Sequence, residues 1–294
     1  MFALLLLACT GDDPAVDDSA ATDDTGEVVD TAPQPPTPAA YSGGTCPTLE
    51  AGWNDAFLSA DVERRFNLVL PPDPDGAGVL FVFHWLGGSA AQFLNYTPVA
   101  DLAEQNDLIL VVPDSCCGAF EWPFTPNEDP TPDLTFFDDA LSCLSEQHSV
   151  DLSRVYATGM SAGGLWTSFL TMHRAEALAA TAPLSGGTEG AMLWTEPARP
   201  LPVLLTWGGE NDTFGSGGTQ LSFHDANLAF SADLTESGSW VGHCVHDLGH
   251  DIHPDSIDYL ATFFGDHVWG QPSPYADGFP SSFPDWCGLP GEVW

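Results

Sequence analysis

A serine flanked by glycines, in the segment GMSAG at 159–163, has the clearest potential for chemistry in this chain. An apolar stretch at 154–158 precedes it, and a stretch of helical character at 164–170 follows it. A strand that turns sharply into a helix exposes the central serine hydroxyl and leaves no room for flanking side chains, so glycine is needed on both sides. The helix N-terminus favours the negative charge that develops there during acyl transfer. The pattern therefore predicts that Ser161 is a nucleophile.

A serine hydroxyl is a weak nucleophile and needs a base, which in turn needs an orienting carboxylate. After a turn of this kind the chain order is serine, acid, histidine. Asp212 follows the apolar stretch 203–208 and is the predicted acid, with Glu210 as its competitor. A solvated loop carboxylate is the alternative reading of either residue.

The predicted base is His250, in a segment at 243–253 that holds four histidines. Gly249 permits a tight turn at the tip of the loop, and Pro254 starts the helix behind it. We expect His246 and His253 at the surface.

The oxyanion of an acyl-transfer reaction needs two preorganised N–H donors. One is expected from Ala162, the residue after the nucleophile, and the other from Leu86 in the loop HWLGGSA at 84–90. Both act through the main chain, so their side chains carry little information.

Short β-branched or aromatic runs alternate with longer helical patterns after residue 64, which is typical of a parallel sheet covered by helices on both faces. The expected strands are 65–70, 79–84, 108–113, 155–159, 179–184, 203–208 and 240–245. The expected helices are 90–105, 134–148, 163–173, 222–234 and 254–264.

Two segments rich in proline and aromatic residues, 115–133 and 268–294, interrupt this alternation. Loops of this length are uncommon unless they are functional, and the first follows the C-terminal end of an expected strand, where ligands bind. Phe120, Trp122 and Phe124 are therefore candidates to line a substrate pocket, with Trp85 narrowing its entrance. A hydrophobic loop packed on the domain surface explains the aromatic residues of 115–133 equally well.

The charge balance is extreme, with 42 acidic residues, five basic ones and a formal net charge of -37. Such a surface repels nucleic acids and anionic lipids, which excludes binding to either through charge. A cationic partner or a bound metal would also use acidic residues, but a solvated surface suited to salty surroundings is the favoured interpretation.

The N-terminal part predicts export and anchorage. Residues 1–9 resemble a short lipoprotein signal with Cys9 as the lipidated residue, although a basic region is missing, which suggests a start further upstream. Residues 10–44 are acidic and proline-rich and are expected to form a disordered linker to a catalytic domain at 45–294. The predicted protein is secreted and held at a bacterial membrane by lipid alone; the oligomeric state is left open.

Six further cysteines indicate disulfides in an oxidising compartment. Because the adjacent pair Cys116 and Cys117 cannot easily bond to itself, we expect one of the two to pair with Cys143. There is no C-x-x-C pair, so a thiolate zinc site has no support.

Together these residues resemble the family of extracellular polyhydroxybutyrate depolymerases and feruloyl or acetylxylan esterases, over about 65–264. The resemblance implies an α/β-hydrolase fold. It also implies ester hydrolysis through an acyl-enzyme, in which Ser161 attacks, His250 moves the proton and Asp212 orients His250. Leu86 and Ala162 would hold the oxyanion, and no cofactor is implied. The implied substrates are polyesters, as oligomers or as polymer, or aromatic and acetyl esters of plant polysaccharide.

The sequence departs from that family at two places. The family has glycine after the histidine of the oxyanion loop, whereas here Trp85 follows His84. The family also places its catalytic histidine shortly before Trp-Pro, whereas here the counterpart is His253-Pro254. The catalytic histidine carries over from the family, but the pocket aromatic does not.

Three rival functions use the same residues. Imidazoles and carboxylates alternate at 243–255 and could hold Zn²⁺ or Cu²⁺, although the spacing differs from the helical H-E-x-x-H pattern. A non-catalytic binding domain on this fold is the second rival, and a serine peptidase is the third.

Overall fold

A computed structural model describes residues 34–216 and 220–293. Residues 33–294 form one compact unit. The proposed lipidation at Cys9, the signal at 1–9 and most of the expected linker lie outside the described residues. None of the described helices has the length and apolar character needed to cross a bilayer.

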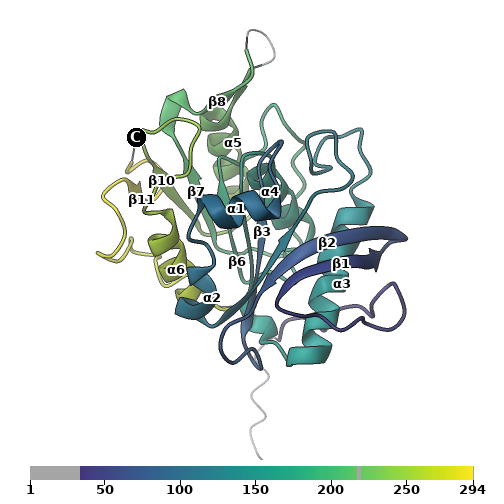
Figure 1. Ribbon diagram of the computed structural model, residues 1–294. Coiled ribbons are helices and arrows are strands. Elements are labelled where there is room, and N and C mark those ends of the chain that lie inside the picture. The colour runs from purple at the N-terminus through teal and green to yellow at the C-terminus, as the bar shows by residue number, and fades with distance from the viewer. Residues whose placement is uncertain (1–33, 217–219, 294) are drawn as a thin grey trace, which may run out of the picture. The chain divides into compact units, whose positions relative to one another are not determined.

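The unit is built on a nine-stranded sheet in the order β1-β2-β4-β3-β5-β6-β7-β10-β11 (Figure 1). The six strands from β4 to β10 run parallel, and β1, β2 and β11 pair antiparallel at the two ends. The strands are β1 (Gly52–Ser59), β2 (Val62–Val69), β3 (Gly78–Phe83), β4 (Leu108–Pro113), β5 (Val155–Met160), β6 (Ala180–Leu184), β7 (Val203–Trp207), β10 (Val241–Val245) and β11 (Cys287–Gly288). A separate hairpin joins β8 (Thr213–Phe214) to β9 (Leu221–Ser222).

Helices cover both faces of the sheet, and each face has its own core. One core takes Phe136, Leu165 and Phe230 from three helices, and the other takes Phe93, Leu102 and Phe263 from the remaining three. The first three helices are α3 (Thr131–His148), α4 (Ala162–His173) and α5 (Phe223–Glu236), and the others are α1 (Ala90–Tyr96), α2 (Asp101–Asn106) and α6 (Ser256–Asp266). Every residue of β3 through β7 is buried, which explains the continuous apolar runs in the sequence.

One expected helix, 90–105, is two helices in the structure. Thr97 ends α1 with an extended backbone, at φ -121° and ψ 149°. The following residue is Pro98, whose ring disfavours helical backbone in the residue before it. The prediction of one continuous helix was therefore wrong.

The folded unit also begins before residue 45, where the sequence placed the end of the linker. Tyr41 is buried against Phe57, with ring centroids 5.2 Å apart. The N–H and Oγ of Ser42 donate to Asp139 over 2.8 and 2.6 Å. These contacts tie 41–42 to β1 and α3.

The disulfides pair Cys46 with Cys143, Cys116 with Cys117, and Cys244 with Cys287. The prediction that Cys116 or Cys117 bonds to Cys143 was wrong. Cys143 lies on the part of α3 that contacts the N-terminal segment, where Gln147 Oε1 accepts the N–H of Leu49 over 2.9 Å. Cys46 is therefore the cysteine within reach of Cys143.

Candidate active site

Ser161 lies at the turn between β5 and α4, in a backbone conformation that few residues adopt, at φ 58° and ψ -116°. A side chain at either flanking glycine would collide with β3. A Cβ at Gly163 would lie 2.1 Å from the carbonyl oxygen of Phe83, and a Cβ at Gly159 would lie 2.6 Å from it. Only glycine fits at both places, so packing against β3 imposes the glycine spacing seen in the sequence.

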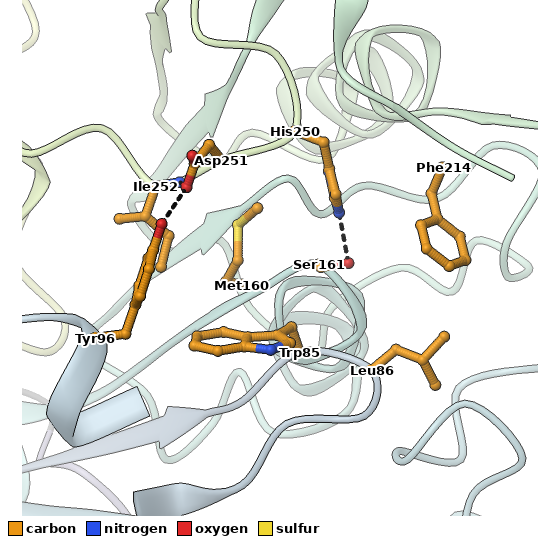
Figure 2. Close-up of a pocket in the computed structure, with 9 residues that line it drawn as sticks. All are labelled: Trp85, Leu86, Tyr96, Met160, Ser161, Phe214, His250, Asp251 and Ile252. Carbon is orange, nitrogen blue, oxygen red and sulfur yellow. Dashed lines mark hydrogen bonds between the residues drawn. The ribbon is translucent and has the colours of Figure 1, made fainter. Parts of the chain in front are cut away.

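The structure brings Ser161, His250 and Asp212 together from three separate segments. His250 Nε2 lies 2.9 Å from Ser161 Oγ, the contact drawn in Figure 2. His250 Nδ1 lies 2.6 Å from Asp212 Oδ1. Asp212 is fully buried, whereas its sequence competitor Glu210 is exposed. The arrangement is a continuous path of hydrogen bonds from a hydroxyl to a buried carboxylate.

Groups that the sequence did not reveal hold this carboxylate and the imidazole. Asp212 Oδ2 accepts hydrogen bonds from Ser185 Oγ over 2.7 Å and from the Gly208 N–H over 2.9 Å. Phe223 stacks on the His250 ring, with centroids 4.6 Å apart and planes 12° apart. Both carboxylate oxygens and one face of the imidazole are therefore fixed.

The loop that carries Asp212 touches the loop that carries His250. A Cβ at Gly208 would lie 1.9 Å from the Gly249 carbonyl oxygen, so the two backbones are in direct contact. Gly249 itself has φ 68°, as expected for the tight turn before His250. Glycine at both positions lets these backbones meet.

The other histidines of 243–253 lie apart from Ser161. His243 is buried, with Nε2 2.7 Å from Ser231 Oγ. His246 is also buried, at 5% exposure, so the prediction that it lies at the surface was wrong. Its Nδ1 accepts the N–H of Leu248, which holds the ring against the loop.

Two cavities, of about 410 and 390 Å³, meet at Ser161 and share Leu86 and Phe214. The first lies beside His250 and has Trp85, Tyr96 and Asp251 in its wall (Figure 2). The second is mainly apolar; its wall includes Phe120, Phe124, Leu165, Leu221 and Phe223. Trp85 lines the first cavity and Phe120 the second, and their contact with a substrate stays a prediction.

Trp122 is the exception among the predicted pocket residues. It has no exposed surface, and its Nε1–H donates to the His84 carbonyl oxygen over 2.9 Å. Its ring packs edge-on against Phe83. The prediction that Trp122 lines a substrate pocket was wrong, because the residue belongs to the core beneath the loop.

In sequence, this chain matches parts of known esterases, and in structure it matches solved proteins over most of its length. No protein-family model matches the chain. Feruloyl esterase B of Thermothelomyces thermophilus is 32% identical over 126 residues, which are 42% of this chain and 43% of that protein. Probable acetylxylan esterase A of Neosartorya fischeri is 26% identical over 38% of this chain and 32% of its own length. The chain thus spans less than half the length of these relatives.

The crystal structure of native sOPH matches over 88% of this chain and all of its own, with a TM-score of 0.71 and 20% identity. A thermostable esterase matches over 74% of this chain and 63% of its own, with a TM-score of 0.54 and 19% identity. The chain has the α/β-hydrolase fold. In this chain Ser161 lies at the turn from the strand β5 into helix α4.

The loop after β3 forms a tight turn beside Ser161. The Gly88 N–H donates to the Trp85 carbonyl oxygen over 2.9 Å, and Gly87 has φ 70°. Among the described residues no hydrogen bond uses the Leu86 N–H. Ala162 is the first residue of α4, where an N–H has no acceptor within the helix. Both expected oxyanion donors therefore adjoin Ser161, and neither has a competing acceptor within the part of the chain that the structure describes.

His84 and Trp122 hold this turn against the segment 115–122. The Ser115 N–H donates to His84 Nε2 over 3.1 Å, so Nε2 carries no proton. Nδ1 then carries the proton and donates to the Trp85 carbonyl oxygen over 2.9 Å. Burial lowers the pKa of His84, which favours the neutral ring that both bonds require.

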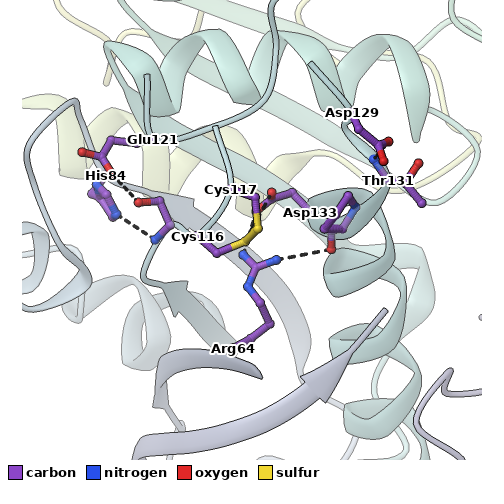
Figure 3. Close-up of a disulfide and its surroundings, with 10 residues drawn as sticks. Arg64, His84, Cys116, Cys117, Glu121, Asp129, Thr131 and Asp133 are labelled. Carbon is purple, nitrogen blue, oxygen red and sulfur yellow. Dashed lines mark hydrogen bonds and ion pairs between the residues drawn. A yellow bond between two sulfur atoms is a disulfide. The ribbon is translucent and has the colours of Figure 1, made fainter. Parts of the chain in front are cut away.

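Glu121 also binds this turn through its carboxylate. No pattern in the sequence indicated this role for Glu121. Its Oε1 accepts the Gly87 N–H over 3.0 Å, and its Oε2 accepts the Ser115 hydroxyl. The residue has φ 74°, a conformation that is rare outside glycine and is often found at functional sites. Figure 3 shows Glu121 and His84 on one side of the Cys116–Cys117 disulfide.

The other side of that disulfide faces a buried ion pair. Cys116 Sγ lies 3.8 Å from Asp133 Oδ2, and Asp133 Oδ1 pairs with Arg64 over 2.6 Å (Figure 3). These two sulfurs and the Asp133 carboxylate are close enough to one another to suggest a metal site. Sulfurs bonded to each other are not thiolates, so the set lacks the donors that a zinc or copper ion needs.

Replacing Glu121 with alanine is expected to lower kcat for ester hydrolysis by about tenfold to a hundredfold, since small displacements of an oxyanion donor cost that much. Glu121→Gln should stay within about threefold of the wild type, because its amide oxygen can still accept the Gly87 N–H. The measurement is steady-state kinetics on a nitrophenyl ester.

Glu128 provides the matched control, since its carboxylate bonds to Thr125 and Ala119 within the same loop and not to the turn. If Glu128→Ala lowers kcat as much as Glu121→Ala does, the loss comes from general disorder of the loop and not from the contact of Glu121 with the turn.

Proposed function

We propose that this chain is a serine carboxylic ester hydrolase. The single observation that carries the proposal is the hydrogen-bonded path from Ser161 Oγ through His250 to the buried Asp212. The partial sequence matches to feruloyl and acetylxylan esterases support ester substrates.

In the proposed reaction Ser161 Oγ attacks the ester carbonyl while its proton passes to His250 Nε2. The N–H groups of Leu86 and Ala162 stabilise the oxyanion. Collapse of this intermediate breaks the bond to the alcohol oxygen, which takes the proton from Nε2. A water molecule then gives a proton to His250 Nε2 and attacks the acyl carbon. The bond from that carbon to Ser161 Oγ breaks, Oγ takes the proton back from Nε2, and the carboxylic acid leaves.

The two cavities suggest how the ester is divided. The alcohol oxygen must lie near His250 Nε2 to receive its proton, and His250 lines the first cavity. The acyl group then occupies the second cavity, whose phenylalanine and leucine side chains favour an apolar or aromatic group. We therefore propose feruloyl or acetyl esters of plant polysaccharide as substrates, with polyhydroxyalkanoate oligomers as the second candidate.

We also propose that the protein is secreted. Three disulfides support this, because such bonds persist in oxidising compartments. Attachment to a bacterial membrane through lipid on Cys9 is a further proposal that rests on the sequence alone.

The test combines a fluorophosphonate label with a substrate panel of nitrophenyl esters, methyl ferulate, hydroxybutyrate oligomers and peptides. Mass spectrometry should locate the label on Ser161, and esters should be hydrolysed faster than peptides. A folded protein that stays unlabelled would be a non-catalytic binding domain, and faster cleavage of peptides would make it a peptidase.

A further inference from the structure

A third cavity lies beside the triad and takes no part in the proposed chemistry. Its volume is about 910 Å³, larger than either cavity at Ser161. Its wall consists of residues 208–211, His224 and Leu228 of α5, residues 245–247, His253 and Trp286. Three of its lining residues are histidines: His224, His246 and His253.

In all three imidazoles Nδ1 accepts a hydrogen bond from an N–H group. His224 Nδ1 accepts the indole N–H of Trp207 over 3.1 Å. His246 Nδ1 accepts the Leu248 N–H over 3.3 Å, and His253 Nδ1 accepts the Asp255 N–H over 3.2 Å. A neutral imidazole whose Nδ1 accepts must carry its proton on Nε2. Each ring therefore presents an Nε2–H donor, and none of the three has a partner among the described residues.

The rest of the wall supplies the complementary groups. Glu210 and Asp247 are exposed carboxylates, and Asn211 adds an amide. Trp286 is half-buried and lies 4.6 Å from the His253 ring. Its position is fixed, because its carbonyl accepts the Val245 N–H over 2.8 Å and its neighbour Cys287 is bonded to Cys244.

These groups fit a polyhydroxylated ring better than an ion. Hydroxyl groups can accept from the three N–H donors and donate to the carboxylates, while an indole face packs against the C–H face of the ring. The carboxylates and the net charge of -37 oppose an anion. Within residues 34–216 and 220–293, one group of three possible metal-binding side chains has its ligand atoms within 4.8 Å of one another, and it consists of Cys116, Cys117 and Asp133. The three imidazoles of this cavity do not form such a group, so they are not arranged to bind a cation together.

The cavity also lies on the alcohol side of the proposed reaction. His250, Asp251 and Ile252 line the first cavity, whereas His246, Asp247 and His253 line this one, so one loop forms a wall of both. A sugar chain whose ester group lies at Ser161 could extend across this loop.

We propose that the cavity lined by His224, His246, His253 and Trp286 binds a neutral sugar residue of the substrate chain, at a distance from the ester. This inference rests on the proposed function. It predicts that unesterified oligosaccharide binds there, and that the cavity contributes to affinity for polysaccharide esters and not to the chemistry.

The first measurement is calorimetric titration of the folded protein with a neutral xylan oligosaccharide. Trp286→Ala and His253→Ala should each weaken binding by about tenfold, as expected for central contacts of a binding site. The control is Trp53→Ala, which removes a partly exposed tryptophan from β1 at the opposite end of the sheet. No binding by the wild type, or equal weakening in the Trp53 variant, would overturn the inference.

The second measurement separates this inference from the proposed function. Trp286→Ala should raise KM for a feruloylated or acetylated oligosaccharide by about tenfold and leave kcat/KM for nitrophenyl acetate within about twofold. Trp286→Phe keeps an aromatic ring against Tyr259, and its KM for the oligosaccharide ester should lie between those of the wild type and Trp286→Ala. This intermediate KM would show that the loss in the alanine variant does not come from misfolding. A wild type inactive on nitrophenyl acetate contradicts the proposed function. If the wild type is active and Trp286→Ala loses equal activity on both substrates, the sugar site is contradicted and the proposed function is not.

Discussion

Ser161→Ala is expected to lower kcat for ester hydrolysis by about a millionfold, the scale seen when the nucleophile of a serine hydrolase is removed. The substitution deletes the hydroxyl 2.9 Å from His250 Nε2 and leaves no atom that can form the acyl-enzyme. The Ser161 N–H to the Leu184 carbonyl, at 2.9 Å, is kept because it is a backbone bond. The melting temperature and circular dichroism should therefore stay close to those of the wild type while activity disappears.

Ser153→Ala is the matched control, because the Ser153 hydroxyl bonds to Asp151 and lies outside the site. It should retain full activity and still be labelled by fluorophosphonate. If Ser161→Ala kept more than about one per cent of the wild-type kcat, another residue would have to be the nucleophile.

Asp212→Asn should lower kcat by about ten-thousandfold through the tautomer of His250. The Gly208 N–H and Ser185 Oγ lie beside Oδ2, and the Gly208 group can only donate. The asparagine oxygen therefore takes that place, and the amide N–H₂ faces His250 Nδ1. Nδ1 must then accept, which puts the proton on Nε2 and prevents that atom from taking the proton of Ser161.

The comparison is with Glu210→Gln, which removes the rival carboxylate of the same segment. Glu210 is exposed, so the variant should hydrolyse nitrophenyl acetate within about twofold of the wild type. A large loss in Glu210→Gln together with a small one in Asp212→Asn would reverse the assignment of the acid.

The sequence allowed prediction where local patterns decide the structure. The strands β3 to β7 are continuous apolar runs because they are buried on both faces, and the GMSAG segment needs glycine because β3 lies against it. Asp212 and His250 could be predicted because each follows a strand and the chain order of the fold is fixed. The structure places His250 within hydrogen-bond distance of Asp212 and Ser161, and the catalytic roles stay predictions that the measurements above test.

Features that depend on contacts between distant segments could not be predicted. The edge strand β1 has a mixed burial pattern, with a register shift between Asn54 and Phe57, which weakens its alternation. The sequence cannot distinguish Trp122 from a pocket residue, because an aromatic side chain in a loop gives the same pattern whether it packs inward or outward. Glu121 and Ser185 gave no signal, since acidic residues and serines are common and their partners lie 34 and 27 positions away.

The direct backbone contact between Gly208 and Gly249 constrains any attempt to redesign this site. Specificity is commonly altered by exchanging loops, yet the loop bearing Asp212 and the loop bearing His250 fit each other only through bare glycine backbone at this point. Either loop transplanted alone from another protein of this fold would not match its neighbour and would displace His250 from Ser161. The two segments should therefore be exchanged as a pair, while the hairpin of β8 and β9, which carries Phe214 into both cavities, offers a site for independent variation.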